Sequence, residues 1–206
     1  MEPRGDSMTG NRSYVQRARA EASSRTRTAI LDATMSLGLE KATADVSLAD
    51  VSERAGVSVQ TVLRHFGTRD GLIDEALRHA AVQIARERRP ASRDLTATIT
   101  TLFDHYESRG DAVIRLLAQE AFDERVEQIT SEGRRVHREW VTEFLGASAA
   151  DTTESLIDQL VVVTDVYTWK LLRRDRGLAR RAAQERVHGM VEAILRAGRS
   201  GQGESS

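Results

Sequence analysis

The side chains best suited to specific chemistry lie between positions 59 and 65. Gln60 and Arg64 are four residues apart, so a helix would place them on one face. Both carry donors that can form paired hydrogen bonds with the edges of nucleic-acid bases. Val59 and Leu63 share that face and could contact a thymine methyl group. This combination makes a poor solvated surface but a plausible face for the DNA major groove.

Local signals predict the two short helices that would hold these side chains. Ser47 precedes an amphipathic segment, and Asp50 three residues later completes the pattern of a capping box. Gly56 is expected to end this helix, because a chain that reverses tightly favours a residue without a side chain. Ser58 is placed to cap the next helix, which is predicted to end near Phe66. The result is the geometry of a helix-turn-helix, with a small shared core of Val51, Ala55, Val57, Val62 and Phe66.

The segment from Ser47 to Phe66, with the Gly-Thr-Arg-Asp-Gly-Leu string that follows it, resembles the DNA-binding signature of the TetR family. The similarity runs from about residue 25 to about residue 80. It implies a homodimer that binds a palindromic operator in double-stranded DNA, with the third helix of each protomer in the major groove. The resemblance also assigns contacts with the phosphate backbone to four residues, namely Ser47, Thr61, His65 and Arg69.

This chain departs from the family pattern at one recognition position. The family commonly has tyrosine where this chain has Leu63, so a hydrogen bond from that position is lost. Ala49 offers no long side chain toward the bases either. Base reading is therefore expected to depend on Gln60 and Arg64. The alternative is that the short helices only pack against one another, as helical hairpins do in unrelated proteins.

Charge is distributed unevenly although the formal net charge is only −1. Residues 11–30 contain one acidic side chain, Glu21, and five basic ones, namely Arg12, Arg17, Arg19, Arg25 and Arg27. A basic end on a neutral chain suits a protein that presents one face to phosphates. A solvated tail with no binding role is the competing interpretation.

The rest of the chain reads as helix, because it is rich in Ala, Leu, Arg and Glu and has only two prolines. The first helix is expected over about 24–37 and the fourth over about 69–88. Further helices are expected near 93–108, 111–121, 123–145, 152–174 and 178–197, with breaks at 109–110, 146–150 and 175–177. The fold class is thus all-α, with an N-terminal three-helix DNA-binding domain and a C-terminal helical domain for ligand binding and dimerisation.

These elements predict five segments. They are a flexible basic arm (1–23), the helix-turn-helix domain (24–70), a connecting helix (71–90), a ligand-binding and dimerisation domain (91–197) and a disordered tail (198–206). The segment 152–174 is apolar almost all round and must be buried on more than one side. The last predicted helix, 178–197, has its apolar residues on one face. These two helices from each of two protomers would form a four-helix bundle. A monomer that folds these helices inward is the alternative.

A small-molecule effector is expected in the C-terminal domain, although the sequence does not identify it. The candidate contacts are most of the aromatic side chains and one acidic residue in an apolar helix, namely Phe103, Tyr106, Trp140, Phe144, Asp165, Tyr167 and Trp169. Aromatic residues at helical spacing are also ordinary core residues. Asp165 could meet a cationic ligand or pair with an arginine across the bundle.

Nothing in the sequence points to catalysis. The chain has no cysteine, and its five histidines form no i,i+4 pair, so no metal and no cofactor are expected. There is no glycine-rich phosphate loop and no nucleophile elbow. No apolar run is long enough for a membrane span, and the expected location is the cytoplasm. The sequence thus favours a repressor released by its effector; an effector-independent regulator or an activator is the second reading, and a helical enzyme or scaffold the third.

Overall fold

The computed structural model describes residues 7–146 and 153–200, and the regular structure in them is helical. The chain divides into two compact units, Met1–Ala80 and Ala81–Ser206. The division falls inside helix α4 (Arg69–Glu87), within the segment predicted to connect the two functional domains. Each unit has its own hydrophobic core, so each is described separately.

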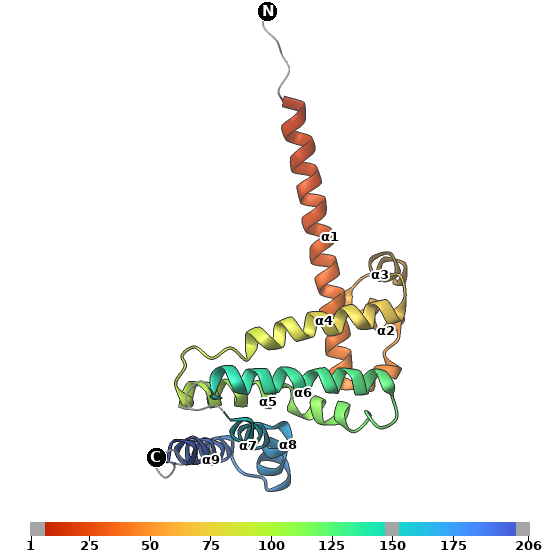
Figure 1. Cartoon of the computed structure of the whole chain (residues 1–206). Coiled ribbons are helices and arrows are strands. Elements are labelled where there is room, and N and C mark those ends of the chain that lie inside the picture. Colours follow the sequence, from red (N-terminus) through yellow and green to blue (C-terminus); the bar gives the residue numbers. More distant parts are fainter. Residues whose placement is uncertain (1–6, 147–152, 201–206) are drawn as a thin grey trace, which may run out of the picture. The chain divides into compact units, whose positions relative to one another are not determined.

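The first unit consists of α1 (Ser7–Glu40), the 3-10 turn η1 (Thr43–Asp45), α2 (Leu48–Ala55), α3 (Val59–Phe66) and the start of α4 (Figure 1). Its core contains apolar side chains from all four helices and from the loop before α2. The buried members are Ile30, Leu31, Ala33, Leu37, Val46, Val51, Val62, Leu72, Ile73 and Ala76. Burial of this set orients α2 and α3 against α1 and α4.

The prediction for the first helix was wrong at both ends. Helix α1 begins at Ser7 rather than near Ser24, so residues 7–23 of the expected flexible arm are helical; residues 1–6 lie outside the described part. It also continues past Gly38 to Glu40. The prediction relied on a buried apolar stripe, and that stripe starts only at Ile30. An exposed helix without such a stripe gives hydrophobic periodicity nothing to detect.

The predicted caps of α2 and α3 are confirmed. The hydroxyl of Ser47 accepts a hydrogen bond from the Asp50 amide at 3.1 Å, and the Asp50 carboxylate accepts one from the Ser47 amide at 2.9 Å. Ser58 accepts from the Thr61 amide at 3.1 Å. Gly56 has a φ of 65°, in the left-handed region that glycine adopts at little cost.

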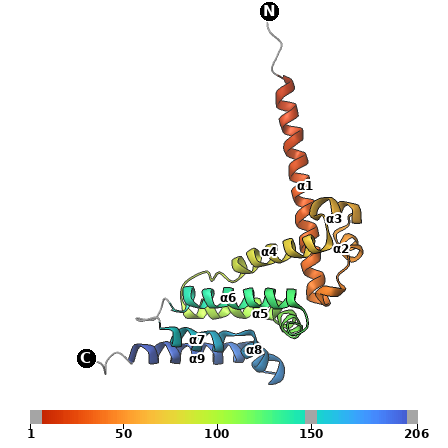
Figure 2. The ribbon, with the colours of Figure 1, turned by 45° about the vertical axis from the view of Figure 1, so that its right-hand side comes forward.

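The second unit contains α5 (Leu95–Leu117), α6 (Glu124–Phe144), α7 (Glu154–Thr164), α8 (Val166–Lys170), a π-helical turn η3 (Leu171–Asp175) and α9 (Arg180–Ser200). Helices α7 and α9 pack along each other, as both ribbon views show (Figures 1 and 2). Helix α5 packs against α6, α8 and α9. The unit's core is built largely from aromatic and branched side chains of these helices.

The predicted break at 109–110 is wrong, because α5 runs through both residues to Leu117. The residues expected as a separate helix over 111–121 therefore mostly belong to α5. Gly110 is needed for close packing and does not end the helix. A Cβ atom built there would lie 2.5 Å from Cζ3 of Trp169, so the indole ring occupies the space that a side chain would need. A glycine required for packing looks the same in the sequence as a glycine that ends a helix.

The predicted single helix over 152–174 is also wrong, because it is divided at Asp165. Asp165 adopts an extended conformation (φ −67°, ψ 154°), and its carboxylate accepts a hydrogen bond from the Tyr167 amide at 2.8 Å. It therefore starts a new helix within the apolar run. Residues 147–152, most of the predicted break before this segment, lie outside the described residues.

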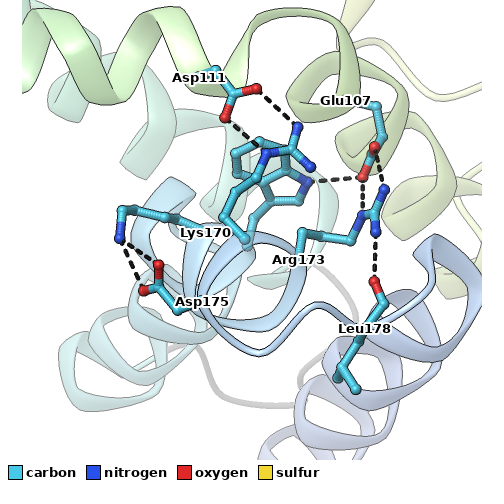
Figure 3. A network of polar contacts seen from close by, with 8 residues as sticks. Glu107, Asp111, Lys170, Arg173, Asp175 and Leu178 are labelled. Carbon is cyan, nitrogen blue, oxygen red and sulfur yellow. Dashed lines mark hydrogen bonds and ion pairs between the residues drawn. The ribbon is translucent and has the colours of Figure 1, made fainter.

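A network of polar contacts fastens η3 to α5 (Figure 3). The Glu107 carboxylate accepts hydrogen bonds from Trp169 Nε1 at 3.0 Å and from Arg173 Nη2 at 2.8 Å. Arg174 donates two bonds of 2.9 Å to Asp111, and its guanidinium lies 4.5 Å from the Trp169 ring. These contacts hold Trp169 in the space left by Gly110.

The last helix α9 continues through Ser200, so residues 198–200 of the expected tail are helical, and residues 201–206 lie outside the described part. Over residues 7–146 and 153–200, no helix combines the length and the apolar character that a membrane span requires.

Candidate nucleic-acid interface

Helix α3 separates an inward face from an outward face. Val62 is completely buried in the core of the first unit. Gln60 and Arg64 are exposed, and Val59 is 37% exposed beside them. Leu63 is half-buried at the edge of the same face. The spacing predicted from the sequence thus places the two long polar side chains together on the surface.

Gln60 and Arg64 have no competing partners among the described residues. None of the hydrogen bonds or ion pairs within that part of the chain involves either side chain. The amide and the guanidinium therefore keep their full capacity for hydrogen bonds to an outside molecule. Both groups can bind base edges through two hydrogen bonds at once, Gln with adenine and Arg with guanine.

Arg27 of α1 fixes the position of α3. Its Nη1 donates to the carbonyl of His65 at 3.2 Å, at the C-terminal end of α3. Its guanidinium also lies 4.6 Å from the centre of the Phe66 ring, and its Nη2 forms an ion pair with Glu75 of α4 at 2.8 Å. One side chain thus joins three helices. The sequence analysis counted Arg27 as part of a basic arm and missed this role, because the contacts span 38 and 48 residues.

The structure gives Arg69 a different task from the one that the family resemblance implied. Its guanidinium donates to the carbonyls of Val46 at 2.8 Å, Thr43 at 2.6 Å and Ala44 at 3.0 Å. These carbonyls belong to the turn before α2. Arg69 therefore holds the entry to the helix-turn-helix, and most of its donors are occupied by protein.

Two other predicted phosphate contacts also serve the local fold. The Ser47 hydroxyl donates to Asp50 at 2.6 Å as well as capping α2. The hydroxyls of Thr61 and Ser58 are 3.0 Å apart and share a hydrogen bond at the start of α3. His65 is half-buried, and its ring lies against Phe66 at the other end of that helix.

Two ion pairs that the sequence analysis did not anticipate lock α2 to the end of α1. Arg54 binds Glu40 through two hydrogen bonds of 2.7 and 2.9 Å, and Lys41 binds Asp50 at 2.8 Å. The hydrogen bond from Lys41, followed by those from Ser47, holds the pKa of the Asp50 carboxyl below its usual range. Both are surface pairs, and each contributes little to stability.

Comparison with known proteins agrees with this geometry. The sequence profile of the family described as bacterial regulatory proteins, tetR family, matches residues 30–76, which cover the end of α1, the helix-turn-helix and the start of α4. Over these residues the chain is similar to the tetR family.

Two relatives of the chain carry the same name, HTH-type transcriptional regulator BetI. The protein from Paraburkholderia phytofirmans is 31% identical over 100 residues, which is 45% of this chain and 51% of that protein. The match thus spans about half the length of this relative. The protein from Burkholderia ambifaria is 25% identical over 184 residues, which is 82% of this chain and 93% of that protein.

Solved structures extend the likeness of fold to both units. A tetR-family transcriptional regulator from Streptomyces coelicolor superposes with a TM-score of 0.67 at 15% identity, over 85% of this chain and 82% of that chain. A transcriptional regulator from Rhodococcus sp. Rha1 gives 0.61 at 18% identity, over 85% and 96%. These identities support the fold alone. The relatives and solved structures named above are themselves described as transcriptional regulators.

The structure brings most, but not all, of the predicted effector residues together. Phe103, Tyr106, Trp140 and Trp169 are buried in the core of the second unit, and Phe144 is packed against it. Tyr167 is 54% exposed, apart from them. The rings lie in two pairs, Tyr106 with Trp169 at 6.0 Å and Trp140 with Phe144 at 5.7 Å. Much of this set therefore has an evident packing role.

The polar neighbours of those aromatic residues were missed by the sequence analysis. Arg88, His105 and His137 are buried among them. Arg88 is buried and the adjacent Arg89 is exposed, but nothing in the sequence distinguishes the two. The contacts of His137 with Arg88 and Thr164 span 49 and 27 residues, so no local pattern reveals them.

Proposed function

We propose that this chain is a DNA-binding transcriptional regulator that binds a palindromic operator as a homodimer, with α3 of each protomer in the major groove. The observation that supports this most directly is the pair of exposed and unengaged side chains on α3, Gln60 and Arg64. The buried Val62 on the opposite face fixes which side of α3 faces outward. A protein that acts on a bacterial chromosome would work in the cytoplasm.

The phosphate contacts in this proposal are revised by the geometry. Thr61 and His65 keep their proposed roles, because both lie at the flanks of the outward face. Ser47 and Arg69 already form hydrogen bonds that hold the loop before α2. Any phosphate contact from these two residues would be a secondary role. Arg17, Arg19 and Arg25 on the exposed part of α1 add positive charge that favours phosphates without reading sequence.

The homodimer is proposed to form through α7 and α9. These helices pack along each other, and each keeps an exposed apolar side chain, Val162 at 65% and Met190 at 36%. Two copies of such a helix pair can form a four-helix bundle with closed twofold symmetry. Two recognition helices then engage two half-sites about one DNA turn apart, roughly 34–36 Å.

Repression is proposed as the sign of regulation, with release by a small-molecule effector bound in the second unit. For this to work, the effector must bind the DNA-competent and DNA-incompetent conformations with different affinity. An effector-independent regulator or an activator has the same DNA-binding unit and is the second candidate.

The direct test measures binding of the full chain to the DNA that flanks its gene by fluorescence anisotropy at two salt concentrations. We expect saturable binding to a palindromic fragment, tighter than to random DNA. Arg64→Ala should weaken operator binding by about 1–3 kcal/mol and relax the preference at one base pair. Arg89→Ala, which removes an exposed charge in the second unit, is the matched control and should leave that preference intact.

If the chain bound every DNA sequence equally, with a steep dependence on salt, its affinity would come from phosphate contacts alone. That result would contradict base reading by α3. Sedimentation of the protein–DNA complex gives the stoichiometry. Two protomers on each palindrome are expected, and one protomer would contradict the homodimer.

A further inference from the structure

A buried arginine lacks a carboxylate partner in the second unit. Arg88, the residue directly after α4, is 6% exposed. Its Nη2 lies 2.7 Å from His137 Nδ1, and its guanidinium lies 4.7 Å from the centre of the Trp140 ring. Its Nε is buried without a hydrogen-bond partner, and no ion pair within the described residues involves it. A buried guanidinium in this condition is costly to the fold, since buried charges are normally paired.

The nearby carboxylates are committed elsewhere. Glu87 binds Arg109 through two hydrogen bonds of 2.7 and 2.9 Å. Asp165 caps α8 through the Tyr167 amide; it attracts Arg88 electrostatically, but no hydrogen bond joins the two, and burial raises the pKa of its carboxyl. Neither carboxylate therefore completes the hydrogen bonding of Arg88.

Two imidazoles, those of His105 and His137, lie near the arginine, and both are neutral. The Arg88 guanidinium can only donate, so His137 Nδ1 must accept and its proton must lie on Nε2, 3.2 Å from the Thr164 hydroxyl. His105 is also buried, and its Nδ1 lies 3.9 Å from the Glu87 carboxylate, too far for a hydrogen bond. Burial, followed by the positive charge of Arg88, lowers the pKa of each imidazole to about 3. The cluster thus holds a positive charge and unused polar atoms inside an aromatic core.

We propose that Arg88, with His105 and His137 beside it, forms the binding site of a small organic acid whose carboxylate supplies the missing counter-charge. The planar guanidinium matches a carboxylate through two parallel hydrogen bonds. Nearby Tyr106 and Trp140 suit an aromatic or aliphatic body on the same molecule. A dianionic phosphate is disfavoured, because its second charge would have to be desolvated among neutral groups.

The residues next to Arg88 in the sequence are largely exposed. Arg88 is followed directly by the exposed residues of the segment 89–94, which joins α4 to α5. As an assignment of the effector, the inference rests on the proposed function; as an assignment of a binding site, it does not.

The test uses the full chain without DNA and measures thermal unfolding and calorimetric binding with benzoate, acetate and butyrate at constant ionic strength. We expect at least one of these acids to raise Tm by several degrees, with benzoate exceeding its neutral isostere benzamide. Arg88→Met should weaken binding by about 10- to 100-fold, as expected for the loss of hydrogen bonds to a charged group. Arg89→Met, a change at the adjacent exposed arginine, should retain binding.

Arg88→Met also separates a ligand site from a purely structural role. Removal of an unpaired buried charge should leave Tm without ligand unchanged or higher. A fall in Tm together with unchanged acid binding would make Arg88 structural and overturn the proposal. Failure of all three acids to exceed chloride, or stabilisation by phosphate and not by carboxylates, would overturn it as well.

A second measurement links the site to regulation. The acid that binds best is added to the operator complex of the wild type and of Arg88→Met. If the acid releases the operator DNA from the wild type but not from Arg88→Met, the effector assignment is supported. Binding of the acid without release from DNA would retain the site and overturn its regulatory role, while absence of operator binding would count against the proposed function only.

Discussion

The two units differ in where they keep their charged groups. In the first unit the arginines lie at the surface, paired with carboxylates or carbonyls, and Arg64 is left open to the outside. In the second unit a guanidinium and two imidazoles lie inside the core, and Arg88 Nε and His105 Nδ1 have no hydrogen-bond partner there. The first arrangement prepares a surface for a large polyanion. The second places polar groups where only a small molecule could complete them.

The largest expected effect of this difference is loss of stability of the second unit in mild acid. His105 and His137 have folded-state pKa values of about 3, below the ordinary 6.5. Below pH 6.5 the unfolded chain therefore binds protons that the folded chain does not, and stability falls as the pH falls from 6.5 toward 3. Between pH 7.5 and 5.5 the two imidazoles together should cost about 3 kcal/mol.

Urea unfolding followed by tryptophan fluorescence measures this loss selectively. Both tryptophans of the chain, Trp140 and Trp169, lie in the second unit. His137→Gln should remove about half of the pH dependence whatever its effect on stability at neutral pH. A pH-independent urea midpoint in the wild type over this range would refute the neutral, buried state of the imidazoles.

The next effect concerns packing across the second unit. Gly110→Ala places a Cβ atom 2.5 Å from the Trp169 ring and should destabilise the protein by about 1–3 kcal/mol. Gly133→Ala is the matched control, because α6 leaves open space at that position; it should be neutral or stabilising by up to about 1 kcal/mol. Urea midpoints check both variants, and equal effects would mean that Trp169 does not fill the space at Gly110.

The smallest effect concerns the first unit, which depends on local caps. Ser58→Ala removes the hydrogen bond to the Thr61 amide and should cost about 1 kcal/mol, whereas Ser58→Asn should restore most of it. Hydrogen exchange of α3 amides gives the change. If Ser58→Asn destabilises α3 as much as Ser58→Ala does, capping is not what sets the stability of this helix.

The same contrast explains how much could be predicted from the sequence. The helix-turn-helix was predictable down to the caps at Ser47 and Ser58 and the turn at Gly56, because each signal acts over three or four residues. The outward face of α3 followed from helical spacing alone. Roles that depend on distant partners were not predictable, and Arg69, whose guanidinium binds three carbonyls 23–26 residues away, is the clearest case in this unit.

In the second unit the local signals pointed the wrong way. Gly110 looked like the end of a helix, although the Trp169 ring 59 positions later explains it. Asp165 looked like a polar residue on one long apolar helix, although it ends one helix and caps the next. The aromatic candidates were correctly seen as apolar and large, but the sequence could not separate core residues from those beside Arg88.

The fit of Gly110 to Trp169 constrains how this protein can diverge. The two positions share one volume, so a substitution at either one alters what the other tolerates. A descendant that gains a side chain at 110 should also exchange the tryptophan at 169 for a smaller residue. Glu107 would then lose the hydrogen bond from Trp169 and keep the one from Arg173. Paired change at 110 and 169 would thus mark lineages in which α5 and α8 have kept their spacing.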